Sequence, residues 1–278
     1  MRCFIFIFSF FYFYTFSQET KFPNLYSFKS EKFSVEKYDT SILNVFYSFK
    51  SKNPQRPNYN IESLCILQIG DNFSKFCDYN IIKKDSLLQK LNEKNVIIGN
   101  DISKFENYKE KWPVINLKND NTKSIIYQNR VRNRYEYDEN QPSIVWTLDN
   151  STKKVLGYIC NRATARYRGR NYIAWYTTDI SKNNGPYIFE GLPGLILEIS
   201  DDEDYVHFSA VAINDKSMEI YLRNEKSIIK TSRKKFREVQ KSYFENPGVF
   251  YGNAYNEDGS SMVVKPRASI PYNPMELE

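Results

Sequence analysis

The chain has 278 residues, 41% of them hydrophobic and 16% aromatic, and it carries a formal net charge of +6. This supply of apolar side chains is enough for a packed core and excludes a chain that is disordered throughout. Lys and Arg are interspersed with Asp and Glu, which is typical of a solvated surface, and we expect no nucleic-acid partner.

Residues 1–17 have the layout of a secretory signal peptide. Arg2 precedes an uncharged run from Phe4 to Phe16, and Ser17 completes a cleavage pattern of small residues. We favour a cleaved signal over a membrane anchor because the run is shorter than the roughly 18 residues that cross a bilayer. The sequence therefore predicts an exported protein that is not integral to a membrane, with residues 18–278 as a single β-rich extracytoplasmic domain.

The first strand is expected over residues 42–49, followed by a proline-containing loop over 51–60. A hairpin is predicted next, with strands at 63–69 and 74–79. Folding this hairpin about Asp71 places Cys65 directly opposite Cys77, which predicts a disulfide in an oxidising compartment. The alternative is two separate buried thiols.

From residue 122 to 213 the sequence alternates between strand-like runs and short turns, which implies antiparallel pairing. One turn is expected at 149–152. Another is expected at Gly169-Arg170, which would place Thr164 opposite Trp175. The strands expected around these turns are 124–129, 143–148, 155–166 and 172–178.

The hairpin of residues 195–200 and 205–213 has the clearest pattern. Side chains alternate between the two faces of a strand, and six apolar side chains fall on one face here. That face should line the core, whereas Glu198 and His207 should pair on the other face and the acidic turn at 201–204 should point to water. The six apolar residues are Leu195, Leu197, Ile199, Val206, Phe208 and Ala210.

Two helices are predicted. Asp85 or Ser86 can cap a short helix that runs through Leu91, and Thr231 or Ser232 can cap a longer one that ends near residue 244. Few helices among many strands indicate a mainly β or α+β fold. We expect an antiparallel meander-type sheet, able to curve into a half-barrel, with one longer C-terminal helix.

The segment 185–196 reads Gly-Pro-Tyr-Ile-Phe-Glu-Gly-Leu-Pro-Gly-Leu-Ile. It resembles the signature of the GLPGLI family of secreted bacterial proteins, and residues 157–160, 168–176 and 273–277 are similar to that family too. The resemblance implies export in a Gram-negative bacterium, with the periplasm or the outer-membrane surface as the place of action. It implies no particular activity and no catalytic residue.

In physical terms the signature is a turn-rich connection. Pro193-Gly194 fits the centre of a type II turn, where Gly supplies the positive φ. We favour a rigid crossover that fixes the register of the next hairpin. The alternative is a loop whose backbone N–H groups meet a ligand or partner. Its candidate contact residues are Pro186, Gly191, Pro193 and Gly194.

A second group of candidate contact residues lies in the central strands. Aromatic side chains beside arginines suit carbohydrates, peptides or lipid headgroups, and the alternative is sheet packing with a basic hairpin tip. The candidates are Trp146, Arg166, Arg168, Arg170 and Trp175.

The sequence does not assemble a recognisable active site. A single histidine excludes a zinc site built from several histidines, and the cysteines lack zinc-finger spacing. We predict no catalytic residue, metal or cofactor. The favoured function is a non-enzymatic envelope binding or carrier protein, whose ligand is apolar or extended and meets the concave side of the sheet. The alternatives are a protein that docks on an outer-membrane complex and a hydrolase with paired carboxylates.

Overall fold

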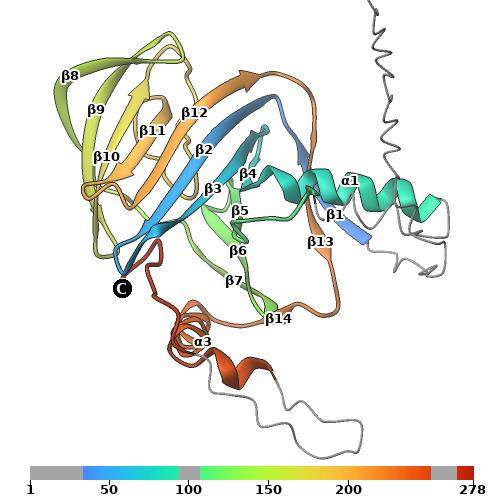
Figure 1. The fold of residues 1–278 in the computed structure, drawn as a ribbon. Helices are drawn as coiled ribbons and strands as arrows, with labels where there is room; N and C mark the ends of the chain where they lie inside the picture. The colour runs from blue at the N-terminus through green and yellow to red at the C-terminus, as the bar shows by residue number, and fades with distance from the viewer. Residues whose placement is uncertain (1–33, 94–106, 252–267) are drawn as a thin grey trace, which may run out of the picture.

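The computed structural model describes residues 34–93, 107–251 and 268–278, so the predicted signal peptide at 1–17 lies outside these ranges. Strands dominate the described residues, with α1 and α3 at the periphery (Figure 1). The elements in chain order are β1 (Ser34–Thr40), β2 (Leu43–Asn53), β3 (Arg56–Ile69), β4 (Phe73–Asp78), α1 (Tyr79–Glu93), β5 (Ile115–Asn119), β6 (Ser124–Val131), β7 (Asn133–Asn140), β8 (Thr147–Val155), β9 (Tyr158–Tyr167), β10 (Arg170–Thr177), β11 (Leu195–Asp201), β12 (Val206–Asn214), β13 (Glu219–Asn224), β14 (Ile229–Lys230), α3 (Arg233–Glu245) and the 3-10 helix η1 (Pro247–Tyr251).

Twelve strands form one sheet in the order β14-β7-β6-β5-β4-β3-β2-β12-β11-β10-β9-β8. Strands β2 to β7 make one meander and β8 to β12 make a second, and the antiparallel pairing of β12 with β2 joins them. Among the named strands of the described residues, the short contact of β14 with β7 is the one parallel pairing. The sheet bends round its own inner face without closing (Figure 1). The predicted mainly β fold with an antiparallel meander is confirmed.

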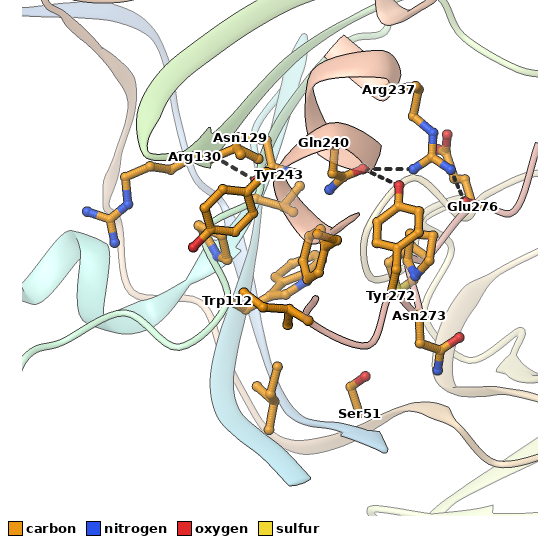
Figure 2. A pocket seen from close by; sticks show the side chains of 18 of the residues that line it. Ser51, Trp112, Asn129, Arg130, Arg237, Gln240, Tyr243, Tyr272, Asn273 and Glu276 are labelled. Atoms are coloured by element: carbon orange, nitrogen blue, oxygen red, sulfur yellow. Dashed lines mark hydrogen bonds between the residues drawn. The ribbon is translucent and has the colours of Figure 1, made fainter. Parts of the chain in front are cut away.

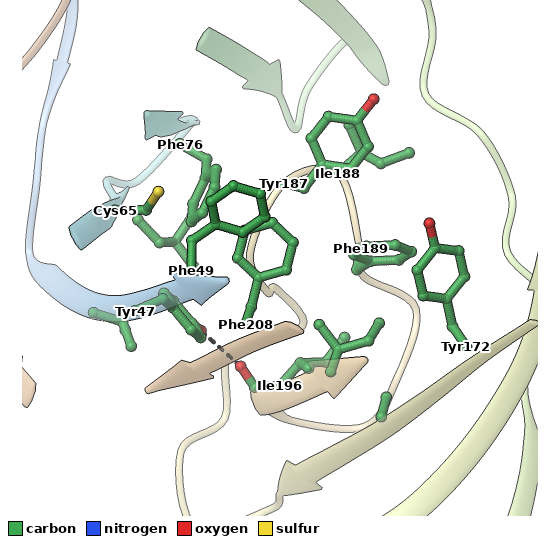
Figure 3. Close-up of a cluster of buried hydrophobic side chains, with 14 of the residues drawn as sticks. Tyr47, Phe49, Cys65, Phe76, Tyr172, Tyr187, Ile188, Phe189, Ile196 and Phe208 are labelled. Carbon is green, nitrogen blue, oxygen red and sulfur yellow. Dashed lines mark hydrogen bonds between the residues drawn. The ribbon is translucent and has the colours of Figure 1, made fainter. Parts of the chain in front are cut away.

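The two faces of the sheet carry separate apolar clusters. The inner face holds the larger one, in which Phe49 stacks on Phe208 with ring centroids 4.7 Å apart (Figure 3). The Tyr47 hydroxyl in this cluster donates a hydrogen bond of 2.6 Å to the Ile196 carbonyl. The outer face holds a smaller cluster, covered by α1 and by β13, which pairs with β1. All six apolar residues predicted for the core face of β11 and β12 are buried, as expected.

The predicted Cys65–Cys77 disulfide is wrong. Ile69 pairs with Ser74, so the turn spans Gly70 to Phe73 and Cys65 lies opposite Asp78 rather than Cys77. A shift of one residue moves a side chain to the other face of a sheet. Cys65 therefore belongs to the inner cluster and Cys77 to the outer one, and both are buried free thiols.

The turns expected in the central hairpins are also displaced. The β9–β10 turn is Arg168-Gly169, with φ of 42° and 86°, and not Gly169-Arg170. Positive φ at both central residues is the type I′ pattern that matches the twist of antiparallel strands. The pairing moves by two residues, which puts Thr164 opposite Ile173 but keeps each side chain on its expected face. The turn expected at 149–152 is an irregularity inside β8.

Local hydrogen bonds explain the ends of the helices. Ser232 caps α3, and its side chain accepts from the Lys235 N–H, which confirms that prediction. Helix α1 begins earlier than expected because Asp78 Oδ1 accepts from the Asn80 N–H at 2.9 Å at the end of β4. Residues 51–60 are not a loop, since β2 continues to Asn53 and β3 starts at Arg56.

Candidate functional site

A cavity of about 510 Å³ lies between the inner face of the sheet, helix α3 and the C-terminal segment 270–276 (Figure 2). We call it the tail cavity. Volumes of about 300–1,000 Å³ with mainly apolar walls are typical of small-molecule sites. The wall side chains are largely aromatic or aliphatic, and they include Phe49, Ile61, Trp112, Tyr127, Val131, Tyr137, Tyr187, Phe236, Tyr243, Phe244 and Met275.

Helix α3 closes one side of the tail cavity. Phe236 and Tyr243 are seven residues apart and so fall on one stripe of the helix, which faces the sheet. The Phe236 ring lies 5.6 Å from the Tyr135 ring and 5.8 Å from the Tyr137 ring, centroid to centroid. This packing holds the helix to β7 and fixes the width of the cavity.

Polar groups occur both behind the aromatic wall of the tail cavity and at its rim. The Tyr127 hydroxyl is buried among its wall residues and has no hydrogen-bond partner in the described parts of the chain. Burial raises the pKa of Tyr127 well above its usual value, so this hydroxyl keeps its proton. At the rim, Tyr272 and Arg237 both donate to Gln240 Oε1, at 2.8 and 2.9 Å (Figure 2).

The C-terminal segment is held at the tail cavity by a buried carboxylate. Glu276 Oε1 accepts hydrogen bonds of 2.7 Å from Arg168 and from the Tyr187 hydroxyl, and Oε2 accepts one of 2.8 Å from Arg233. The Arg237 guanidinium also donates to the Glu276 carbonyl. Glu276 is therefore bound by three parts of the chain: helix α3, the β9–β10 turn and the signature segment.

Arg168 and Arg170 were predicted as ligand or partner contacts. Both instead bind the C-terminal segment of the same chain. Arg170 is buried, donates to the Pro274 carbonyl at 2.7 Å and forms an ion pair of 2.6 Å with Asp201. Asp201 also accepts from the Val206 N–H, so the expectation that the whole acidic turn points to water is wrong at this residue. Asp202 to Asp204 are exposed, as expected.

The other candidate contacts in the central strands do not meet in one site. Trp146 donates from Nε1 to the Glu190 carbonyl at 2.7 Å, beside Gly191. Trp175 is elsewhere, with the Lys153 ammonium 4.5 Å from its ring centroid. Arg166 is exposed on β9. Trp146 and Trp175 therefore contact different parts of the protein, and neither contact involves Arg166.

The signature segment fills the inside of the curved sheet. Ile188, Phe189 and Leu192 are fully buried in the inner cluster (Figure 3). Lys118 of β5, also buried, forms an ion pair of 3.2 Å with Glu190. These contacts match the rigid crossover that we favoured over a ligand-binding loop.

The proline turn of the signature differs from the expected type II turn. The Gly194 N–H donates to the Leu192 carbonyl at 2.7 Å, which closes a three-residue turn around Pro193. Gly194 has a φ of 149°, and a Cβ there would lie 2.0 Å from the Thr177 carbonyl oxygen. Pro186 and Gly194 are buried, whereas Gly191 and Pro193 reach the surface.

The Glu198 and His207 side chains, predicted to pair, do approach each other, and Lys153 joins them. Glu198 lies opposite Ser209, not His207, yet its side chain reaches diagonally to within 3.4 Å of His207 Nε2 and 2.6 Å of the Lys153 ammonium. Among the residues that the structure describes, no three His, Cys, Asp or Glu side chains gather as a metal site. Glu276 is the one carboxylate on the described wall of the tail cavity.

Comparison with known proteins gives a family match over a short stretch. A family described as "Protein of unknown function (Porph_ging)" matches residues 168–198, from the β9–β10 turn through the signature into β11. The chain is similar to that family there, and the match carries no activity. No curated protein matches the chain.

Two solved structures are similar to part of the fold. They are described as "Structure of PNGF-II in P21 space group" and "Structure of PNGF-II in C2 space group". They are 15% and 16% identical to this chain, and each has a TM-score of 0.47. Each alignment covers 74% of this chain and 34% of the other, so this chain spans about a third of those proteins.

Within the described residues, no helix is both apolar enough and long enough to traverse a bilayer.

Proposed function

We propose that this chain is a non-enzymatic binding or carrier protein of the Gram-negative cell envelope, of the GLPGLI type, that holds an apolar or extended ligand in the tail cavity. The observation that carries the proposal is an aromatic-walled cavity of about 510 Å³ with Arg237, Gln240 and Tyr272 as polar groups at its rim. Burial of apolar ligand surface supplies the affinity, at about 25 cal/mol per Å² before binding costs, and the polar rim orients a polar group of the ligand.

The two alternatives have less support from the contacts. Docking on an outer-membrane complex would use the basic and aromatic residues of the central hairpins, but two of these, Arg168 and Arg170, are engaged with the C-terminal segment. A hydrolase needs two carboxylates that share a cleft. On the described wall of the tail cavity, Glu276 is alone and is held by two guanidinium groups.

Export is tested on the full-length chain in its own host. We expect fractionation to place the mature protein in the envelope and N-terminal sequencing to begin at Gln18. A chain that keeps residues 1–17 in the cytoplasm would contradict the localisation without affecting the cavity.

Binding is tested with a matched pair of substitutions on β2. Ser51 lies on the wall of the tail cavity, whereas Ser48 lies on the opposite face of the same strand and is only half-buried. Ser51→Phe should fill the cavity, and Ser48→Phe adds the same ring outside it. The probe is N-phenyl-1-naphthylamine, an apolar dye whose fluorescence rises when it is bound.

We expect the wild type and Ser48→Phe to bind the dye and Ser51→Phe to lose at least tenfold in affinity. Native mass spectrometry of protein taken from its own envelope should show an added mass that Ser51→Phe lacks. Equal dye binding by all three proteins, or a wild type that neither binds dye nor carries a ligand, would refute the proposal.

A further inference from the structure

A second cavity, of about 280 Å³, lies at the other face of the sheet, where α1, β7 and β13 approach one another. We call it the arginine cleft. Five cationic side chains line it against three acidic ones, so its walls carry an excess of positive charge. The cations are Lys84, Arg130, Arg132, Arg134 and Arg223.

The three acidic side chains of the arginine cleft are already paired. Asp85 is buried and accepts from Arg223 Nε at 2.8 Å and from the Tyr221 hydroxyl at 3.0 Å. Glu225 accepts from the same guanidinium at 2.9 Å. Glu110 lies 2.6 Å from Arg130 Nη2 and 3.9 Å from the Lys84 ammonium.

Arg134 takes no part in these ion pairs. Its side chain is half-buried at the start of β7, and it forms no hydrogen bond or ion pair with any residue that the structure describes. Burial lowers the pKa of Arg134, and nearby Glu225 and Glu110 only partly oppose that effect. A desolvated guanidinium without a carboxylate partner lowers the stability of the fold. A purely structural role therefore does not explain Arg134.

Lys75 does not line the arginine cleft but lies close enough to Arg134 and Arg223 to interact with their charges. The ammonium of Lys75, a buried residue on β4, lies 4.0 Å above the ring centroid of Tyr221. Burial lowers the pKa of Lys75; Cys77 and Asp85 oppose that shift, and the positive charges of Arg134 and Arg223 add to it. An anion that enters the arginine cleft therefore meets several fixed positive charges in a partly desolvated site.

We propose that the arginine cleft binds a tetrahedral oxyanion, a phosphate or sulfate group, with the Arg134 guanidinium as its main donor. The planar fork of a guanidinium donates two parallel hydrogen bonds to such a group. Ser227 and Asn133 on the cleft wall add neutral hydrogen-bonding groups. The free ion and a phosphorylated or sulfated ligand present the same chemistry to these donors. Arg130 lines both cavities, whereas Arg134 lines the arginine cleft and is not on the wall of the tail cavity.

The test is thermal unfolding of the full mature protein in a few millimolar phosphate or sulfate, against sodium chloride at equal ionic strength. Arg134→Gln removes the donor, Arg134→Lys keeps the charge, and Arg166→Gln removes an exposed arginine on β9 as the matched control. Sulfate and phosphate also stabilise proteins by exclusion from the surface, but that effect is equal in all variants.

We expect phosphate and sulfate to raise the Tm of the wild type and of Arg166→Gln, because a ligand that binds only the native state stabilises it. Arg134→Gln should lose the rise, and isothermal titration with phosphate should show at least a tenfold weaker Kd. Arg134→Lys should keep part of the rise. Ser51→Phe should keep it fully, which separates this site from the tail cavity.

Two results would overturn the proposal. One is an equal rise in Tm for the wild type and Arg134→Gln, which would assign the effect to general exclusion. The other is a wild type whose Tm in phosphate and sulfate is the same as in chloride. Arg134→Gln should also unfold at no lower urea concentration than the wild type in chloride, because it removes a half-buried charge that has no partner.

Discussion

Arg168, at the tip of the β9–β10 hairpin, donates a hydrogen bond of 2.7 Å to Glu276, which lies 108 residues further along the chain. The same carboxylate is bound by Arg233 of α3 and by Tyr187 of the signature segment. The end of the chain is thus a structural part of the tail cavity, and the charges at the hairpin tip position it there.

Glu276→Ala should destabilise the protein by about 3 kcal/mol, because it leaves two partly buried guanidinium groups without their shared carboxylate. Urea unfolding measures the loss, and dye binding to the tail cavity should weaken as the tail loosens. The control is Glu278→Ala, which removes an exposed side chain and should change stability by less than about 0.5 kcal/mol. Equal losses in the two variants would contradict the role given to Glu276.

Gly194→Ala should be among the most harmful single changes in the signature. Its φ of 149° is unfavourable for other residues, and a Cβ would lie 2.0 Å from a backbone oxygen that cannot move freely. We expect a loss of at least about 3 kcal/mol in urea unfolding. Gly157→Ala is the matched control, since its φ is 86° but nothing lies within 4 Å of a Cβ, and it should cost about 1 kcal/mol. A similar loss in both would show that strain alone, without the clash, decides the cost.

Alternation of side chains along the strands was enough to predict the fold class and the buried face of β11 and β12. It did not determine hairpin register, because the length of a turn is set by backbone conformation rather than by hydrophobic pattern. An error of one residue at Asp71 moved Cys77 to the outer face, whereas an error of two at Gly169 left Trp175 on its expected face.

The tail cavity could not be predicted from local patterns. Its walls come from β2, β6, α3 and the final residues, so it depends on contacts between residues far apart in the chain. The one signal within the sequence was the closing segment 273–277, which resembles the same family as the signature. A carboxylate there, at Glu276, needs partners when it is buried, and the arginines assigned to an external partner supply them.

The observed register of β3 and β4 predicts how the Cys65 and Cys77 thiols react. Burial raises the pKa of Cys77 to about 11 and also raises that of Cys65, so both thiols are protonated and shielded at neutral pH. Iodoacetamide should leave both unmodified in the native protein and alkylate both in 8 M urea without a reductant. Peptide mapping reports each site separately, and a disulfide-linked peptide joining residues 65 and 77 would show that the register is wrong.

His207 is the one histidine of the chain, and its titration should make the stability of the fold depend on pH. The neighbouring Glu198 carboxylate is the largest influence and, with Asp204, raises the pKa of His207 above its usual 6.5 despite burial. A group whose folded pKa is raised contributes stability that is complete below the unfolded pKa and is lost as the pH rises through the folded pKa. The stability lost in His207→Gln should therefore be largest below about pH 6.5 and shrink at higher pH.

Proton NMR of the single imidazole measures that pKa in the folded protein, and urea unfolding from pH 5 to 9 measures the stability difference. Glu198→Gln should lower the pKa of His207, because it removes the carboxylate 3.4 Å from Nε2. Glu203→Gln neutralises an exposed acidic residue in the adjoining turn and should leave the pKa nearly unchanged. If both variants shift the titration equally, the effect belongs to the overall charge of the turn, and the diagonal contact between β11 and β12 does not set the protonation of His207.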